Sequence, residues 1–461
     1  MSNHNYIFNN VNDALPALMR DLIVKGDEFG SRAGKTLELM HVGITLVSPQ
    51  QREIVIPERK ANIAAQIVET MWILSGRNDV AGLAHYLPRA ADFSDDGVEW
   101  RAGYGPRLRN YHGVDQLAYI VDTLADNPSS RQAVATIWDP TVDTKPGKDI
   151  ACNNWLSFSS RHGKVDLQVG IRSNDAMWGW SGINAFEWSA LLELVAVLTG
   201  SEMGSLHFAT TSFHLYEQHW AKAQKIAEID GNFLYTDSPR MTLGEHPVLE
   251  GFDELAWGWF AVEESIRYGR EVNVDNFPDP MLRSWLRVLQ WYWSGNEAFL
   301  KKLDRTRLQQ ACIVGVKPAG QPQNEQLRLP DFLSFVNDLH SQKHAAYGDS
   351  WKRRGEYMIL ANIARKVDRL EGGKDTPDET QSDTAIDLMV YLAKYRSWLS
   401  GGLGDPDEVE VILRKLPGKT APNTIVSSFE ALESARGDEF KIALVDGLLV
   451  QAYTLALSLW K

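Results

Sequence analysis

The stretch DPTVDTKPGKDIACNNWLSF, residues 139–158, holds Cys152, one of two cysteines in this 461-residue chain. Its first part is rich in Pro, Gly and Asp, which favours turns, and a strand is expected to follow. Cys152 therefore lies where a side chain can face a cleft. Because a lone cysteine is more often an inert buried residue than a nucleophile, its role has to be judged from the segments around it.

Two further segments follow Cys152 at short spacing. VGIRSNDAMWGWSGINAFEWSALLEL spans residues 169–194, and SLHFATTSFHLYEQH spans residues 205–219. A thiolate that adds to C6 of a uracil ring makes C5 nucleophilic toward an electrophilic carbon. Arg172, with Arg131 and Arg32, could stabilise such a thiolate and bind a nucleotide phosphate. These residues fit such a reaction, which the family resemblance identifies as attachment of one carbon to C5 of a pyrimidine nucleotide.

The order of these segments resembles the thymidylate synthase family over residues 15 to about 220. Four upstream segments fit the same family: RAGKT (32–36), VETMWILSGRND (68–79), RAGYGPRLR (101–109) and NPSSRQAVATIWDP (127–140). The resemblance implies an α+β fold with a mixed sheet and packed helices. It also implies a homodimer in which Arg131 reaches the site of the partner.

The resemblance further implies a role for each site residue. Cys152 is the nucleophile, Glu69 organises water and proton transfer at the base, and Tyr104 and Asn153 complete the catalytic positions. The expected ligand-binding residues are Arg32, Arg131, Arg172 and Ser173 for the phosphate, Asn184 for the pyrimidine edge, His214 and Tyr216 for the ribose hydroxyl, and Asp175 for the pterin. The implied cofactor is 5,10-methylenetetrahydrofolate, and the implied substrate is a pyrimidine nucleoside monophosphate.

Asn184 bears on which base is bound. Its amide offers a donor and an acceptor, which suits uracil, whereas hydroxymethylases that act on cytosine tend to carry Asp there. Aligning Asn184 requires a one-residue shift within AMWGWSGIN, residues 176–184. We therefore expect dUMP in preference to dCMP as the substrate.

Several departures from the family pattern bear on the product. Asn153 replaces the usual His, Gln132 a second Arg, and Ser212 an Asp, while HYLPRAADFSDDG (85–97) replaces a Trp-bearing segment beside the folate. The short tail that closes the family's site is also replaced by further chain. A lid that excludes water protects hydride transfer, so its loss favours water addition. We expect a dUMP hydroxymethylase like those of phages, with thymidylate synthase proper (dUMP to dTMP) and dCMP or CMP hydroxymethylase as alternatives.

The remaining chain is expected to be helical. We divide it into a catalytic domain (1–230), a Trp-rich mainly helical extension (231–320) and an all-α bundle (321–461). The bundle weakly resembles nucleotide pyrophosphohydrolases related to MazG. Asp383 and Asp387 lie four apart on an expected helix and could hold Mg²⁺, although a solvated face with capping Asp residues is the plainer alternative.

Composition limits the other possibilities. A net charge of −13 argues against nucleic-acid binding, because phosphate contacts need clustered Lys and Arg. We see no secretory signal and no membrane-length apolar stretch, which predicts a cytoplasmic protein with free thiols. A nucleotide- or RNA-binding regulator with an inactive site is the non-enzyme alternative. Cys152, Arg172, Asn184 and Tyr216 together argue against it.

Overall fold

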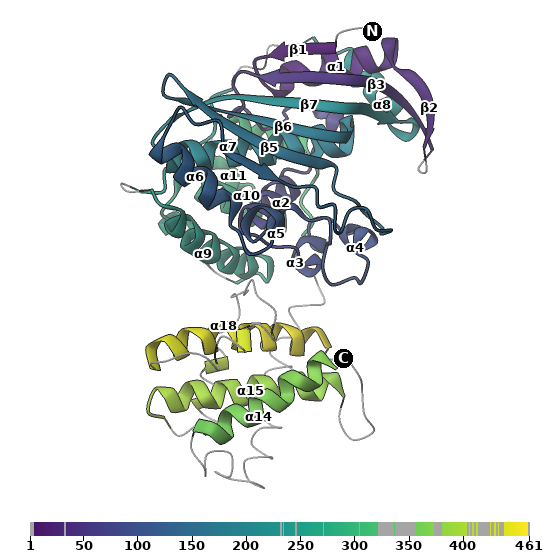
Figure 1. Ribbon diagram of the computed structural model, residues 1–461. Helices are drawn as coiled ribbons and strands as arrows, with labels where there is room; N and C mark the ends of the chain where they lie inside the picture. The colour runs from purple at the N-terminus through teal and green to yellow at the C-terminus, as the bar shows by residue number, and fades with distance from the viewer. Residues whose placement is uncertain are drawn as a thin grey trace. The chain divides into compact units, whose positions relative to one another are not determined.

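The computed structural model (Figure 1) describes most of the chain. The described residues are 4–31, 34–230, 233, 235–244, 247–270, 272–303, 305–320, 336, 356–372, 380–402, 405, 408–409, 412–413, 425, 428–429, 432 and 438–459. Contacts divide the chain into two compact units, Met1–Ala256 with Asn273–Gly320, and Trp257–Val272 with Gln321–Lys461.

A mixed sheet forms the frame of the first unit. Its described strands are β1 (His4–Phe8), β2 (Asp27–Ser31), β3 (Gly34–Leu46), β4 (Val134–Thr136), β5 (Asn153–Arg161), β6 (Lys164–Asp175) and β7 (Glu202–Tyr216). They follow the order β1-β3-β7-β6-β5-β4, with β2 paired to β3. The β1–β3 and β6–β7 pairs are parallel and the others antiparallel. The expected α+β class with a mixed sheet is confirmed.

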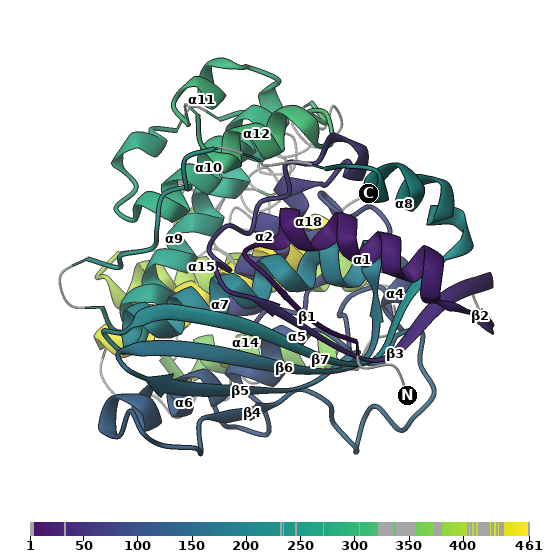
Figure 2. The ribbon, with the colours of Figure 1, turned by 90° about the horizontal axis from the view of Figure 1, so that it is seen from above.

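Helices cover one face of this sheet. Figure 2 shows α1 (Val11–Lys25), α2 (Ile63–Leu74) and α7 (Ala185–Leu198) on one side of the strands. The other helical segments of the unit are η1 (Pro57–Arg59), α3 (Val80–Ala84), α4 (Ala90–Phe93), α5 (Tyr104–Arg109), α6 (Gln116–Asp126), η2 (Ala176–Asn184), η3 (Glu217–His219), α8 (Trp220–Ala227), η4 (Val274–Asn276), α10 (Pro280–Ser294), α11 (Ala298–Lys301) and α12 (Arg307–Val314), while α9 (Leu249–Arg267) crosses the boundary between the units.

The helix formed by η2 and α7 lies in the core. Among the described residues, Ala176–Leu198 is the one helix long and apolar enough to cross a membrane, and 83% of its apolar window is buried within the protein. Leu191, Leu194 and Val195 of this helix are fully buried. Its hydrophobicity is thus accounted for by packing against the sheet.

The opposite face of the sheet is open within one chain. Strand register aligns one exposed or half-exposed row across the sheet, made of Ile7, Thr45, His207, Gln168, Ser157 and Val134. The next row, which includes Leu46, Leu206, Leu167 and Phe158, is buried under the helices. Only one side of the sheet is therefore covered by the described part of the chain.

Residues 273–320 fold with the first unit and do not form a separate extension. Trp285 packs on Phe186 of α7 with ring centroids 5.6 Å apart, and Trp293 Nε1 donates to the Tyr86 hydroxyl at 2.7 Å. Residues 257–272 instead belong to the second unit. This division differs from the expected break at residue 230, because the Trp-rich helices bury their aromatic faces against earlier parts of the chain.

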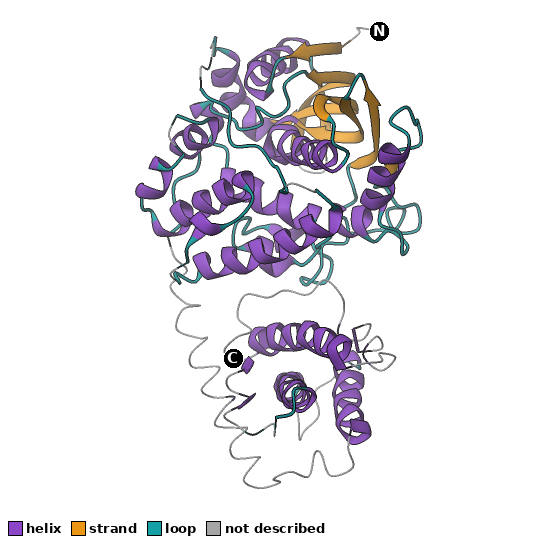
Figure 3. Cartoon of the chain, turned by 90° about the vertical axis from the view of Figure 1, so that its left-hand side faces the viewer, coloured by secondary structure: helices purple, strands orange, loops and turns teal. Residues whose placement is uncertain are grey.

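The described part of the second unit is helical. It contains α14 (Glu356–Glu371), α15 (Gln381–Leu399) and α18 (Asp438–Leu459), and Figure 3 shows helices there without strands among the described residues. Ile363, Leu388, Leu392 and Leu448 are fully buried and belong to its core. The expected helical C-terminal region is present.

Candidate active site

Cys152 lies immediately before β5, and strand pairing brings Arg172 of β6 beside it. Asn153 pairs with Ile171 in the antiparallel ladder. Cys152, which precedes Asn153, therefore lies opposite Arg172, which follows Ile171. Arg172 Nη2 lies 3.7 Å from Cys152 Sγ, and the guanidinium donates to the carbonyl oxygens of Ile150 (2.8 Å) and Ala151 (2.9 Å). The predicted nucleophile and its predicted cation are therefore neighbours.

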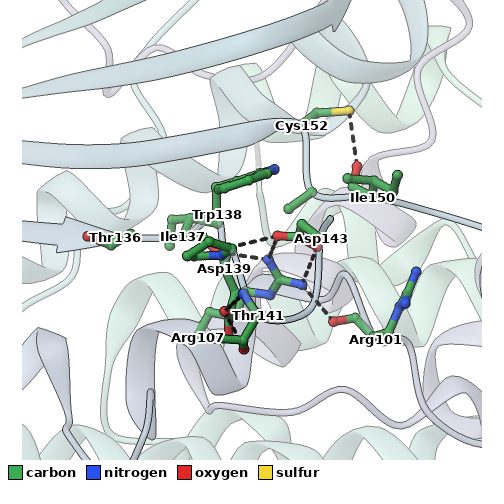
Figure 4. Close-up of polar contacts among 12 residues, drawn as sticks. Arg101, Arg107, Thr136, Ile137, Trp138, Asp139, Thr141, Asp143, Ile150 and Cys152 are labelled. Carbon is green, nitrogen blue, oxygen red and sulfur yellow. Dashed lines mark hydrogen bonds and ion pairs between the residues drawn. The ribbon is translucent and has the colours of Figure 1, made fainter. Parts of the chain in front are cut away.

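The charge around the thiol is mixed. Burial raises the pKa of Cys152, Arg172 opposes that rise, and Asp149 adds to it. The Cys152 thiol also donates to the Ile150 carbonyl at 3.7 Å (Figure 4). Arg172 is thus the group that favours the thiolate.

Arg107 anchors the loop that leads to Cys152, a role the sequence did not reveal. This buried residue of α5 donates to the carbonyls of Ile137 (2.8 Å) and Arg101 (3.0 Å) and to both carboxylate oxygens of Asp143 (Figure 4). Burial works against ionisation of Asp143, but Arg107 holds its pKa below the usual range. The start of the loop at Ile137 and its middle at Asp143 are therefore tied to one guanidinium.

Tyr104, the first residue of α5, faces the same region. Its ring stacks on Trp188 with centroids 5.7 Å apart. Burial raises the pKa of Tyr104 well above 10, and the charges of Cys152 and Glu187 raise it further. The hydroxyl therefore lies within electrostatic reach of both the thiol and α7.

Glu187 interacts with both Asn184 and Glu69, and its place in the site was not predicted from the sequence. Asn184 Nδ2 donates to Glu187 Oε1 at 2.8 Å. Burial raises the pKa of Glu69 to about 7, whereas burial and the charge of Glu69 raise the pKa of Glu187 well above 4.5. A signal was present, since Glu187 is a carboxyl within the apolar run AFEWSALLEL.

The segment between Asp175 and Asn184 is a π-helix. It comprises the nine residues Ala176–Asn184. Its N-cap residue is Asp175, whose Oδ1 accepts hydrogen bonds from the backbone N–H groups of Met177 (2.6 Å) and Trp178 (2.9 Å). A π-helical turn accommodates an extra residue in a helix. It explains the one-residue shift needed to align Asn184.

Parallel pairing of β6 and β7 gathers the remaining predicted ligands. Ser173 pairs with Ser212, and Asp175 pairs with His214. The rings of His214 and Tyr216 lie 5.3 Å apart, edge to face, and His214 Nδ1 lies 3.2 Å from Ser212 Oγ. The predicted ribose and pterin residues therefore lie on adjacent strands.

The surroundings of Arg131 and Asn153 differ. Arg131 is exposed just before β4, and Arg32 lies outside the described residues. Asn153 is fully buried, and its amide faces the Tyr104 hydroxyl, where it opposes the rise in the Tyr104 pKa that burial causes. The structure does not bring Arg131 into direct contact with the other predicted ligands, and the roles of Arg131 and Asn153 stay predictions.

Some polar groups are available for a pterin. Asp175 Oδ2 and His219 Nε2 are buried without hydrogen-bond partners in the described part of the chain. The Trp178 ring is 49% exposed and lies 5.1 Å from His219, edge to face. An unpaired carboxylate oxygen beside an exposed aromatic ring fits a flat heterocycle with N–H donors.

The suggested Mg²⁺ ligands of the second unit make other contacts in the structure, and their metal role stays a prediction. Asp383 caps α15, with its carboxylate accepting from the backbone and hydroxyl of Thr380, and Asp387 pairs with Lys366 at 2.8 Å. Within the described ranges no group of three or more His, Cys, Asp or Glu is placed to hold a metal ion. The resemblance to pyrophosphohydrolases stays a prediction.

About half of the chain matches known proteins. The family model described as Thymidylate synthase matches residues 15–264. A deoxyuridylate hydroxymethyltransferase of Bacillus phage SP01 is 37% identical over 252 residues, covering 52% of this chain and 64% of that protein. Proteins of the same name from Pseudomonas phage M6 and Delftia phage PhiW-14 are each 32% identical, covering 59% and 45% of this chain and 79% and 60% of theirs. The chain thus spans less than two thirds of two of these relatives.

Proposed function

The chain belongs to the thymidylate synthase family, and we propose that it transfers one carbon from 5,10-methylenetetrahydrofolate to C5 of dUMP and forms 5-hydroxymethyl-dUMP. The observation that carries this proposal is Arg172 Nη2 at 3.7 Å from Cys152 Sγ, since the thiolate is the attacking species. The hydroxymethyl product is supported by the names of three phage relatives.

When bound, 5,10-methylenetetrahydrofolate would supply the electrophilic carbon, and the proton that C5 loses would be taken up as tetrahydrofolate leaves. Cys152 bonds to C6 of the base, which makes C5 nucleophilic, and Asn184 binds the pyrimidine edge. Glu69, with its pKa raised to about 7 by burial, accepts a proton from the water that adds to the methylene left on C5. Breaking of the S–C6 bond restores the ring and the free thiolate.

The other predicted residues bind the remaining parts of the nucleotide and the folate. Arg172 and Ser173, together with Arg131 and Arg32, bind the phosphate, and His214 with Tyr216 binds the ribose hydroxyl. Asp175 binds the pterin, which is supported by its unpaired buried Oδ2.

We further propose a homodimer built on the open face of the sheet. The exposed row from Ile7 to Val134 gives each copy the same surface to pair, and the exposed Arg131 lies before β4 at the edge of that face. Mixing Cys152→Ala and Arg131→Ala proteins should restore about a quarter of the wild-type rate, because half of the dimers then hold one intact site. A mixture as inactive as its components contradicts the dimer.

Conversion of dUMP to dTMP is the rival reaction within the family. It oxidises the folate to dihydrofolate, whereas hydroxymethylation releases tetrahydrofolate. A reaction with dUMP should therefore consume the nucleotide without the absorbance change of dihydrofolate. Dihydrofolate formed in step with dUMP loss would establish thymidylate synthase activity instead.

A further inference from the structure

Glu187 and Asn184 form a buried polar pair at the start of α7. Glu187 is 1% exposed and Asn184 is 5% exposed. Asn184 Nδ2 donates to Glu187 Oε1 at 2.8 Å, while Glu187 Oε2 is buried without a hydrogen-bond partner among the described residues. Because a buried carboxyl costs free energy unless it is well hydrogen-bonded, this residue calls for an explanation beyond packing.

Helix capping does not supply that explanation. Asn184 is the N-cap residue of α7 and Glu187 is its third residue, a spacing that often forms a capping box. Here the Asn184 side chain makes no hydrogen bond to a helix N–H, and Glu187 bonds to the side chain of Asn184. The pair is therefore used to hold an amide in place.

The orientation of this amide decides which base it can read. With Nδ2 held by Glu187, Asn184 Oδ1 is left to accept N3–H of uracil, and the second N–H of Nδ2 can donate to O4. Cytosine presents a lone pair at N3 and an amino group at C4, so it requires the amide to be reversed. A carbonyl oxygen at Glu187 accepts the same bond whether the carboxyl is ionised or protonated.

We propose that Glu187 fixes the Asn184 amide in the uracil-reading orientation and so makes the site select uracil over cytosine nucleotides. The inference rests on the proposed function for the identity of the site. Glu187 is a positioning residue, since it acts through Asn184.

The test measures equilibrium binding of dUMP and of dCMP to the full chain by calorimetry, without folate. We expect wild type to prefer dUMP and Glu187→Leu to reduce the ratio of the two affinities at least about tenfold. Glu187→Gln keeps a carbonyl that can accept from Nδ2, so it should retain the ratio within about threefold. Glu193→Gln, on the same helix but bonded to Arg52 and Arg240, should leave the ratio unchanged.

A double-mutant cycle separates positioning from a structural role. In an Asn184→Ala background, Glu187→Leu should leave the affinity ratio unchanged, because there is no amide to orient. A wild type without preference for dUMP, an unchanged ratio in Glu187→Leu, or parallel loss of both affinities overturns the proposal. If Glu187→Leu does not melt cooperatively, the smaller Glu187→Ser replaces it in the same comparison. Binding needs no turnover, so a dTMP product would overturn the proposed function and leave this inference intact.

Discussion

Arg172 places Nη2 3.7 Å from Cys152 Sγ while the same guanidinium holds the backbone that carries the cysteine. One side chain therefore sets both the position and the charge environment of the thiol. Burial alone raises the pKa of Cys152, and Arg172 is the cation that works against it. The pairing arises from the sheet, because β5 and β6 are antiparallel neighbours.

Replacing Arg172 by Gln should slow alkylation of Cys152 about tenfold near pH 8, because an adjacent cation shifts a thiol pKa by about one unit or more. The rate would be followed by mass spectrometry of the Cys152 peptide after iodoacetamide treatment. Cys312 provides an internal control, since it is buried in the same unit and distant in sequence. Equal Cys152 rates in the two proteins would contradict the assigned role.

Glu69 should make stability depend on pH. Its pKa is raised from 4.5 to about 7 in the folded state, so its stabilising contribution is complete below pH 4.5 and is lost as pH rises through 7. As the pH rises from 4.5 to 7, thermal melts should show the Glu69→Gln variant becoming more stable relative to wild type. The same change at the exposed Glu254 serves as the matched control. A constant difference for Glu69→Gln would rule out the raised pKa.

Arg107→Met should destabilise the protein by about 3–5 kcal/mol, because it leaves the buried carboxylate of Asp143 without its cation. The side chain of Asp143 is fully buried and that of Arg107 is 7% exposed. Urea unfolding would measure the loss, and adding Asp143→Asn should recover part of it. No recovery in the double variant would show that the pair itself is not the cause.

Trp285→Ala should cost about 3–5 kcal/mol, because it removes a buried aromatic side chain packed on Phe186 of α7. Chemical denaturation would measure the effect, with the half-exposed Trp178→Ala as a control expected to change stability little. A small effect at Trp285 would mean that residues 273–320 do not support the catalytic unit.

The sequence allowed the fold class to be predicted, and the order of its motifs pointed to Cys152 and Arg172, which the antiparallel pairing of β5 and β6 brings together. It did not reveal Arg107 or Glu187. In sequence a charged residue on a helix is usually a surface residue, and only the tertiary contacts show that Arg107 is buried, whereas the apolar run around Glu187 was a signal of its burial. Spacing on a helix likewise does not show that Asp383 completes a capping box and that Asp387 pairs with a lysine, so their Mg²⁺ role stays a prediction.

The division of the chain into two units could not be predicted from local sequence patterns either. Residues 231–320 read as one helical extension, yet their Trp side chains pack against segments more than a hundred residues away, as the Tyr86–Trp293 hydrogen bond illustrates. The π-helix before Asn184 explains why simple alignment slipped by one residue there. Such features depend on which surfaces meet in three dimensions.

The mass of the nucleotide formed from dUMP and methylenetetrahydrofolate in a single turnover tests the account most directly. A product about 30 Da heavier than dUMP, formed by wild type and absent with Cys152→Ala, is the predicted result for addition of a hydroxymethyl group. A product about 14 Da heavier, or undiminished turnover by Cys152→Ala, would contradict it.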